Sequence, residues 1–173
     1  MNTVVCDTGP IIHLKEAGLL KLLQETGKIC IPQMIETELS EIDPLWKKQR
    51  PEWILVVPLS PNEIKQAESL VLSGLLDFGE AEAIILAKKL NPKWFLTDDT
   101  EARVLANSLG MEVHGSLGVV LWSAAVGHLS YVESKKALDK LSKTSLWISK
   151  DILLQAQEAL KAMFEKMLNR NDS

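Results

Sequence analysis

The sequence contains only two cysteines, Cys6 and Cys30, which lie far apart and form no CxxC pair. Each stands inside a short apolar run, as is typical of a buried structural thiol rather than of a metal ligand or redox centre. Long apolar runs are also lacking, because the most apolar window, 117–129, is too short to span a bilayer and contains glycine, serine and histidine. These scarcities exclude a disulfide scaffold and predict a protein with no membrane partner.

Positive charge is not in excess, since 19 Lys and Arg against 23 Asp and Glu give a net charge of −4. A protein that coats nucleic acid by bulk charge needs many Lys and Arg contacts to phosphate, so that class is disfavoured. An enzyme that contacts nucleic acid locally and keeps an acidic site for metal is compatible with this balance. The sequence start lacks a basic segment followed by an apolar stretch, so we expect no signal peptide and a cytoplasmic protein.

Glycine-rich phosphate-binding loops are missing as well. Neither the Gly-x-x-x-x-Gly-Lys-Ser/Thr pattern nor a Gly-x-Gly-x-x-Gly pattern after the first strand is found, so nucleotide binding by those routes has no support.

What the sequence does have is a regular alternation of strand-like and helix-like segments. With 173 residues, 46% of them apolar and 24% charged, it has the size and composition of one soluble domain. We expect strands at 3–6, 28–31, 54–59, 94–96 and 111–113. We expect helices at 11–23, 32–41, 60–72, 80–90, 100–109 and 116–126, two more within 131–168 with a break near 145–149, and a loop at 43–52. This order predicts an α/β fold with a mostly parallel sheet covered by helices on both faces.

Acidic residues recur where the predicted strands end. Asp7 directly follows the first strand, and Asp98 and Asp99 directly follow the strand at 94–96. Two further groups fall on helices that begin near the same sheet edge: Glu36 with Glu38, and Glu80 with Glu82. Each group alone has an ordinary explanation as a helix cap or an exposed helix residue. Sites in open parallel sheets form beyond the carboxyl ends of the strands, so we expect these acids to converge there.

Several carboxylates at one edge repel each other, and a cation offsets that repulsion. Mg²⁺ and Mn²⁺ prefer oxygen ligands, usually one or two carboxylates together with water and a substrate phosphate. Such an ion polarises a phosphoryl oxygen and lowers the pKa of bound water. A carboxylate cluster without nearby His or Cys therefore points to metal-dependent phosphodiester chemistry.

The same residues carry a family resemblance. The motifs are Val4-Val5-Cys6-Asp7-Thr8-Gly9-Pro10, then Ile31-Pro32 with Thr37-Glu38-Leu39, then Gly79-Glu80-Ala81-Glu82-Ala83-Ile84, and then Leu96-Thr97-Asp98-Asp99. In this order they resemble a PIN (PilT N-terminus) domain over about residues 3–130. The stretch 110–121 is similar to a PIN subfamily of predicted nucleic-acid-binding proteins.

The resemblance implies a three-layer α/β/α fold, with a PIN-like domain at 1–130 and a C-terminal helical extension at 131–173 packed on it. It implies a hydrolase, a Mg²⁺- or Mn²⁺-dependent endoribonuclease that cuts single-stranded RNA. VapC-like toxins of toxin–antitoxin pairs share this fold, so the implied partners are an RNA substrate, an antitoxin protein and a second copy of the chain.

Carried over by position, the implied catalytic and metal-binding acids are Asp7, Glu38, Glu82 and Asp99. Glu82 takes the place of an Asp usual in many VapC-like toxins, which lengthens one ligand arm. Asp98, a further metal ligand, and Glu80 are close enough to exchange roles with their neighbours, and the sequence leaves both choices open. Thr8 is expected to orient Asp7 or a bound water.

Other polar and apolar groups have simpler explanations. We expect His13 to be structural or exposed, Arg103 to pair with Asp99 rather than with phosphate, and a lysine-rich helix face around 135–143 to be solvated. An apolar face of the last helix either packs on the chain's own domain, which we favour, or forms a homodimer or antitoxin contact. It consists of Leu153, Ala156, Leu160, Met163, Phe164 and Met167.

Two alternatives to a nuclease are a non-catalytic PIN-like module that binds RNA or protein, and a response-regulator receiver domain. A receiver domain needs an acidic pair after the first strand. Here the acidic pair, Asp98 and Asp99, follows a late strand and Asp7 stands alone, so we disfavour that reading.

Overall fold

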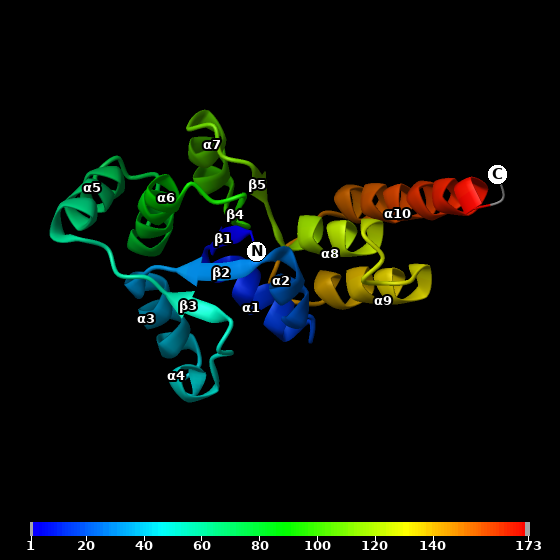
Figure 1. Ribbon diagram of the computed structural model, residues 1–173, viewed down its shortest axis with the longest axis horizontal. Helices are drawn as coiled ribbons and strands as arrows, with labels where there is room; N and C mark the ends of the chain where they lie inside the picture. The colour runs from blue at the N-terminus through cyan, green and yellow to red at the C-terminus, as the bar shows by residue number, and fades with distance from the viewer. Residues whose placement is uncertain (1, 172–173) are drawn as a thin grey trace.

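Five parallel strands form the centre of the computed structural model, which describes residues 2–171 (Figure 1). Their order across the sheet is β3-β2-β1-β4-β5, so the chain moves outward from β1 first on one side and then on the other. The strands are β1 (Thr3–Cys6), β2 (Lys28–Ile31), β3 (Ile54–Val56), β4 (Trp94–Leu96) and β5 (Val113–His114). The sheet is thus wholly parallel, and β3 lies at its edge as Pro58 predicted.

Helices cover both faces of the sheet and complete the predicted three-layer α/β/α fold (Figure 1). One layer contains α5 (Pro61–Val71), α6 (Phe78–Leu90) and α7 (Thr100–Ser108). The opposite layer contains α1 (Thr8–Glu16), α2 (Lys21–Thr26), α3 (Gln33–Ile42), α4 (Trp46–Gln49), α8 (Ser116–Ala125), α9 (Tyr131–Ser142) and α10 (Lys150–Asn171).

Alternate residues of each strand enter opposite layers of the core. In β1, Val4 and Cys6 pack in one apolar cluster and Val5 packs in the other, as the two-residue period of a strand requires. Both cysteines are buried free thiols, as expected, and burial raises the pKa of the Cys6 thiol well above its ordinary value.

The structure corrects five predicted boundaries, the first being the strand expected at 54–59, which is the shorter β3 (Ile54–Val56). The helix expected at 11–23 is two helices, because Gly18 adopts a left-handed backbone (φ +69°) between α1 and α2. The loop expected at 43–52 contains the short helix α4. The last strand is shifted from 111–113 to Val113–His114, and α6 begins at Phe78 rather than at Glu80.

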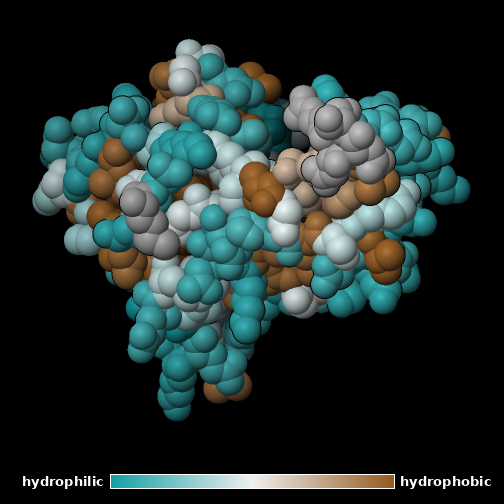
Figure 2. Space-filling model, turned by 45° about the vertical axis from the view of Figure 1, so that its right-hand side comes forward, coloured by the Kyte–Doolittle hydropathy of each residue, from teal (hydrophilic) through white to brown (hydrophobic). Residues whose placement is uncertain are grey.

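The C-terminal helices pack against one another and against the first helices. The apolar face of α10 lies inside the molecule: Ala156 and Leu160 are buried, and Leu153, Met163 and Phe164 pack against them. This is the internal packing that we favoured for that face. The view in Figure 2 shows a mostly hydrophilic surface with apolar residues in separate patches. Within 2–171, no helix is long and apolar enough to cross a membrane.

Candidate active site

A pocket of about 320 Å³ opens beyond the carboxyl ends of the strands and is bounded largely by carboxylates. We call it the acidic pocket. Six acids from separate parts of the chain reach it, with two small residues, a histidine and a leucine. It is lined by Asp7, Thr8, Gly9, His13, Glu38, Asp77, Glu80, Asp98, Asp99 and Leu146.

Asp7 lies at the centre of the pocket, at the end of β1 and the start of α1. Its Oδ1 accepts a hydrogen bond from the Thr8 backbone N–H (2.8 Å), and its Oδ2 accepts one from the Thr97 hydroxyl (2.8 Å). The residue is only 5% exposed. Burial raises the pKa of Asp7 from 3.8 to about 7, against the two hydrogen bonds, and the negative charges of Asp77 and Glu38 raise it further. At neutral pH, protonated and ionised Asp7 are therefore present in comparable amounts unless a cation is near.

Glu38 reaches the pocket from the second turn of α3. The Thr8 hydroxyl donates to its Oε2 at 2.5 Å, so Thr8 holds both Asp7 and Glu38. A Cβ at Gly79 would overlap the Glu38 carboxylate oxygens, so the glycine at the start of α6 gives this side chain its space. Burial raises the pKa of Glu38 as well, and Asp77 adds to that rise.

Asp77 and Glu80 form a reciprocal cap at the start of α6. The Glu80 N–H donates to Asp77 Oδ1 (2.8 Å), and the Asp77 N–H donates to Glu80 Oε2 (2.9 Å). Burial raises the pKa of Glu80 from 4.5 to about 7, and the charges of Asp77, Asp99 and Asp7 also raise it. The sequence analysis missed Asp77, although its Asp-x-x-Glu spacing before an apolar run is the pattern of such a cap.

Glu80 rather than Glu82 lines the acidic pocket. Two residues along a helix turn the side chain by roughly 200°, so the two glutamates point to opposite sides of α6. Glu82 is 7% exposed, and its Oε2 accepts from the Met34 N–H (3.1 Å) at the start of α3. Its carboxylate therefore joins α6 to α3 and does not meet the other acids.

Asp98 and Asp99 also differ. Asp98 accepts from the Ser116 N–H (2.7 Å) and hydroxyl (2.5 Å), and it pairs with His13 Nδ1 (2.7 Å). Its oxygens thus join α1, β4 and α8, and His13 is structural, as expected. Asp99 caps α7 through Oδ1, which accepts from the Ala102 N–H at 2.8 Å, and its Oδ2 has no hydrogen bond within residues 2–171.

The ion pair expected between Arg103 and Asp99 is wrong. Arg103 Nη2 donates to the Thr97 carbonyl at 3.0 Å, and none of the ion pairs found within 2–171 involves this guanidinium. Helical spacing suggested contact with Asp99, but the Asp99 side chain turns back to cap its own helix.

Similarity to known families agrees with this geometry. A family model described as a PIN domain matches residues 3–162. The chain belongs to the PIN domain family. PIN domains have a nuclease-type fold, act on nucleic acid and typically use divalent metal ions. No curated protein and no solved structure is significantly similar to this chain.

The donors in this PIN domain fit a hard divalent cation. All the acidic-pocket acids offer oxygen, and burial, with a smaller contribution from neighbouring acids, raises the pKa values of Asp7, Glu38 and Glu80. Within the described residues, no three His, Cys, Asp or Glu side chains already form a set that could hold a metal ion. The carboxylates are instead fixed by hydrogen bonds to Thr8, Thr97 and helix N-termini. A bound cation would have to draw Asp7, Glu38 and Glu80 inward.

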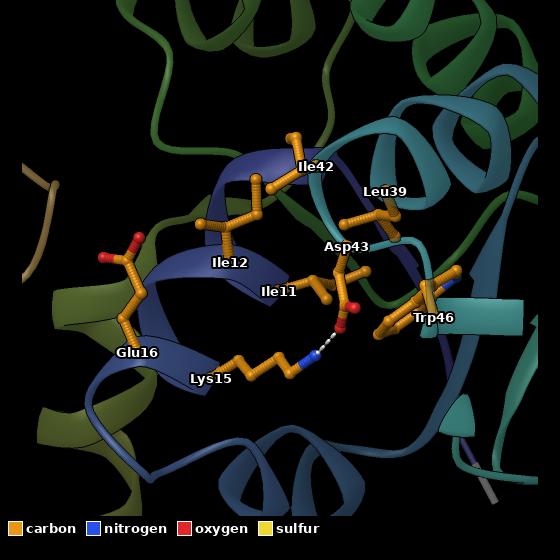
Figure 3. Close-up of a pocket in the computed structure, with 8 residues that line it drawn as sticks. All are labelled: Ile11, Ile12, Lys15, Glu16, Leu39, Ile42, Asp43 and Trp46. Carbon is orange, nitrogen blue, oxygen red and sulfur yellow. Dashed lines mark hydrogen bonds and ion pairs between the residues drawn. The ribbon is translucent and has the colours of Figure 1, made fainter. Parts of the chain in front are cut away.

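A second pocket of this PIN domain has a different character. It holds about 300 Å³ between α1, α3 and α4, and its walls are Ile11, Ile12, Lys15, Glu16, Leu39, Ile42, Asp43 and Trp46 (Figure 3). Lys15 Nζ pairs with Asp43 Oδ2 at 2.5 Å and lies over the Trp46 ring. We call it the apolar hollow. Lys15 and Asp43 pair with each other, and the remaining acid, Glu16, accepts hydrogen bonds from Ser145.

Proposed function

We propose that this PIN domain is a Mg²⁺- or Mn²⁺-dependent endoribonuclease that hydrolyses phosphodiester bonds of single-stranded RNA. One observation carries the proposal: acids from β1, α3, α6 and the β4–α7 junction line one pocket, where the pKa values of Asp7 and Glu80 rise to about 7. A structural role gains nothing from uncompensated buried carboxylates, whereas a metal site needs them.

The metal ligands of this proposal are Asp7, Glu38, Glu80 and Asp99. A bound Mg²⁺ or Mn²⁺ supplies a nucleophilic water and stabilises charge on the phosphoryl oxygens. Asp7 would turn inward from its hydrogen bonds to Thr8 and Thr97, and Asp99 would contribute its Oδ2. These features favour Glu80 over Glu82 and Asp99 over Asp98.

Two residues position these ligands. Thr8 fixes Asp7 through its N–H and Glu38 through its hydroxyl. Asp98 holds His13 and Ser116, and so joins α1 to α8 beside the pocket. These contacts support a positioning role for both residues.

The proposal also includes four expectations from the sequence: a toxin role in a toxin–antitoxin pair, an antitoxin partner, a homodimer and a cytoplasmic location. The boundary at residue 130 is also a proposal, and the family match through residue 162 supports treating α9 and α10 as part of one unit with the sheet.

The test compares two neighbouring glutamates on α6. Wild type should cleave a mixed single-stranded RNA with Mn²⁺ and should be inactive in EDTA. Glu80→Gln and Asp7→Asn should each lower cleavage by about two to four orders of magnitude, since each removes a metal ligand. Glu82→Gln, whose carboxylate lies outside the pocket, is the matched control and should retain most of the activity.

Thermal unfolding gives an independent readout of metal binding. Mn²⁺ at a hundredfold excess over its dissociation constant should stabilise wild type by about 2.7 kcal/mol, and Asp7→Asn should lose most of that gain. If wild type binds RNA and Mn²⁺ but cuts nothing, the alternative of a non-catalytic RNA-binding PIN module is correct. If Glu82→Gln removes the Mn²⁺ effect and Glu80→Gln does not, our ligand set is wrong.

A further inference from the structure

A third pocket lies directly beside the acidic pocket. It has a volume of about 390 Å³ and is built by the end of β5, the first turns of α8, the connection between α9 and α10, and the start of α10. We call it the tryptophan cleft. It is lined by Asp98, Arg103, Val113, His114, Gly115, Leu117, Gly118, Leu121, Leu146, Trp147, Ile148, Ser149 and Ile152. Asp98 and Leu146 line both pockets, so the two adjoin each other.

Trp147 is the exceptional residue of this cleft because it is 84% exposed. The other tryptophans pack inside the protein: Trp46 and Trp94 are buried, and Trp53 and Trp122 are partly buried against the core. A large aromatic side chain left in water forgoes the free energy of burial unless it meets a ligand. Its position next to the acidic pocket indicates which ligand that is.

The connection that presents Trp147 is firmly held. Its neighbours Leu146 and Ile148 both pack against the main apolar cluster. Two residues earlier, the Ser145 N–H donates to Glu16 Oε2 (2.7 Å) and the Ser145 hydroxyl donates to Glu16 Oε1 (2.9 Å), which fixes the connection to α1. The indole is therefore exposed on a fixed segment, as a stacking platform requires.

Arg103 supplies a positive charge at the boundary of the two pockets. It is partly buried, it donates to the Thr97 carbonyl, and it forms no ion pair with any residue that the structure describes. A Cβ at Gly115 would lie 2.8 Å from Arg103 Nη2 and 2.6 Å from Asp98 Oδ1, so the glycine keeps this boundary open. An unpaired guanidinium beside an acidic metal site is suited to a phosphate, which it binds through a planar fork of donors.

We propose that the tryptophan cleft binds one unpaired nucleobase of the RNA substrate, with its ring stacked on Trp147 and its phosphate on Arg103. This inference takes the identity of its ligand from the proposed nuclease function. Bases stack on exposed aromatic rings in single-strand-binding proteins, and every base has a face that can do so. In a duplex both faces are already stacked, so the cleft accepts single strands. It therefore sets the strandedness of the substrate, while the acidic pocket acts on the adjacent phosphodiester.

The test measures binding separately from cleavage. A 3′-fluorescein-labelled 12-nucleotide RNA of mixed sequence is titrated with protein in EDTA, where no metal is present. Trp147→Ala should weaken binding about tenfold or more, and Trp147→Phe should recover most of the loss. Arg103→Gln should weaken binding in a salt-dependent manner, because its contact is to phosphate. Leu72→Ala removes an equally exposed apolar side chain (Leu72 is 87% exposed) outside the cleft and should change nothing.

Two further readouts separate the possible outcomes. RNA should quench tryptophan fluorescence in wild type but not in Trp147→Phe, and Trp147→Ala should leave the affinity for a pre-annealed RNA duplex unchanged. With Mn²⁺, Trp147→Ala should raise KM and largely preserve kcat. Unchanged single-strand affinity in Trp147→Ala, or no RNA binding by wild type, overturns the inference. Trp147-dependent binding without any cleavage would refute the nuclease and leave the base site standing.

Discussion

The acidic pocket and the apolar hollow are built partly from the same two helices, α1 and α3. They differ in whether a basic side chain pairs with their acids. In the hollow, Lys15 compensates Asp43, and this hydrogen bond lowers the pKa of Asp43. In the acidic pocket, the charges facing Asp7 and Glu80 are other acids, and their pKa values rise to about 7. A charge that the protein itself compensates has a structural role, whereas an uncompensated one needs a ligand.

The contrast is sharpest along α3, where two glutamates stand two residues apart. Glu36 is 5% exposed, but its Oε2 accepts from Trp46 Nε1 at 2.6 Å and Arg50 Nε lies 3.8 Å from its Oε1. The Glu38 carboxylate accepts a hydrogen bond from the Thr8 hydroxyl and forms no ion pair within residues 2–171. The helix therefore carries an acid with structural partners, Glu36, and a proposed metal ligand, Glu38.

Exchanging each glutamate for glutamine tests this difference and should give the largest effect. Glu38→Gln should lower RNA cleavage by about two to four orders of magnitude, because an amide is a poor ligand for a hard cation. Glu36→Gln should keep activity within a few fold and lose roughly 1–2 kcal/mol of stability, because its bonds to Trp46 and Arg50 weaken. Cleavage rates and urea unfolding measure the two effects. Equal losses of activity in Glu36→Gln and Glu38→Gln would show that the two glutamates do not differ in function.

The pH dependence of stability should separate the pockets next. In EDTA, between about pH 4 and 7, folded Asp7 holds a proton that the unfolded chain has released. The contribution of Asp7 to stability is therefore largest below its unfolded pKa and is lost as pH rises toward and through 7. Relative to wild type, Asp7→Asn should gain roughly 2–4 kcal/mol between pH 4 and pH 8. Urea unfolding at both pH values measures this, and Asp43→Asn should show no such gain.

Removing the Thr8 hydroxyl should have a smaller effect. Thr8→Val keeps the backbone N–H to Asp7 but loses the donor to Glu38, so cleavage should fall roughly 10–100-fold. Thr8→Ser restores the hydroxyl and should restore the activity. A Val variant as active as wild type would show that Glu38 needs no such support.

The smallest effect belongs to the hollow. Lys15→Met removes the partner of an exposed carboxylate while keeping an apolar stem over Trp46, so the melting temperature should move by no more than about 2 °C. RNA cleavage should be unchanged. A large loss of activity would mean that the hollow acts on the acidic pocket through α1.

The sequence predicted the fold well because its signals are local. The β-branched runs, the helix caps and the order of elements determine a parallel sheet, and the sheet then brings Asp7, Asp98 and Asp99 to one edge. Four motifs in order predicted the PIN family, which the family match over residues 3–162 confirms.

The choice between neighbouring acids could not be made in the same way. Glu80 and Glu82 differ only in the side of α6 on which they lie, and that depends on where α6 begins, which the predicted boundary at residue 80 missed. The role of Asp98 depends on its contacts with His13, 85 residues away, and with Ser116. A local sequence pattern cannot predict contacts between residues so far apart in the chain. Helical spacing predicted an ion pair between Arg103 and Asp99, but the Asp99 side chain caps its own helix instead.

Leu146, which closes one side of the acidic pocket, also determines when the site can exist. A ribosome makes the acids from Asp7 to Asp99 first and reaches Leu146 roughly 50 residues later, which takes roughly 2–10 s at ordinary translation rates. During that interval the nascent chain carries its acids without the last wall of their pocket. The pocket can therefore close only after every acid that lines it has been synthesised.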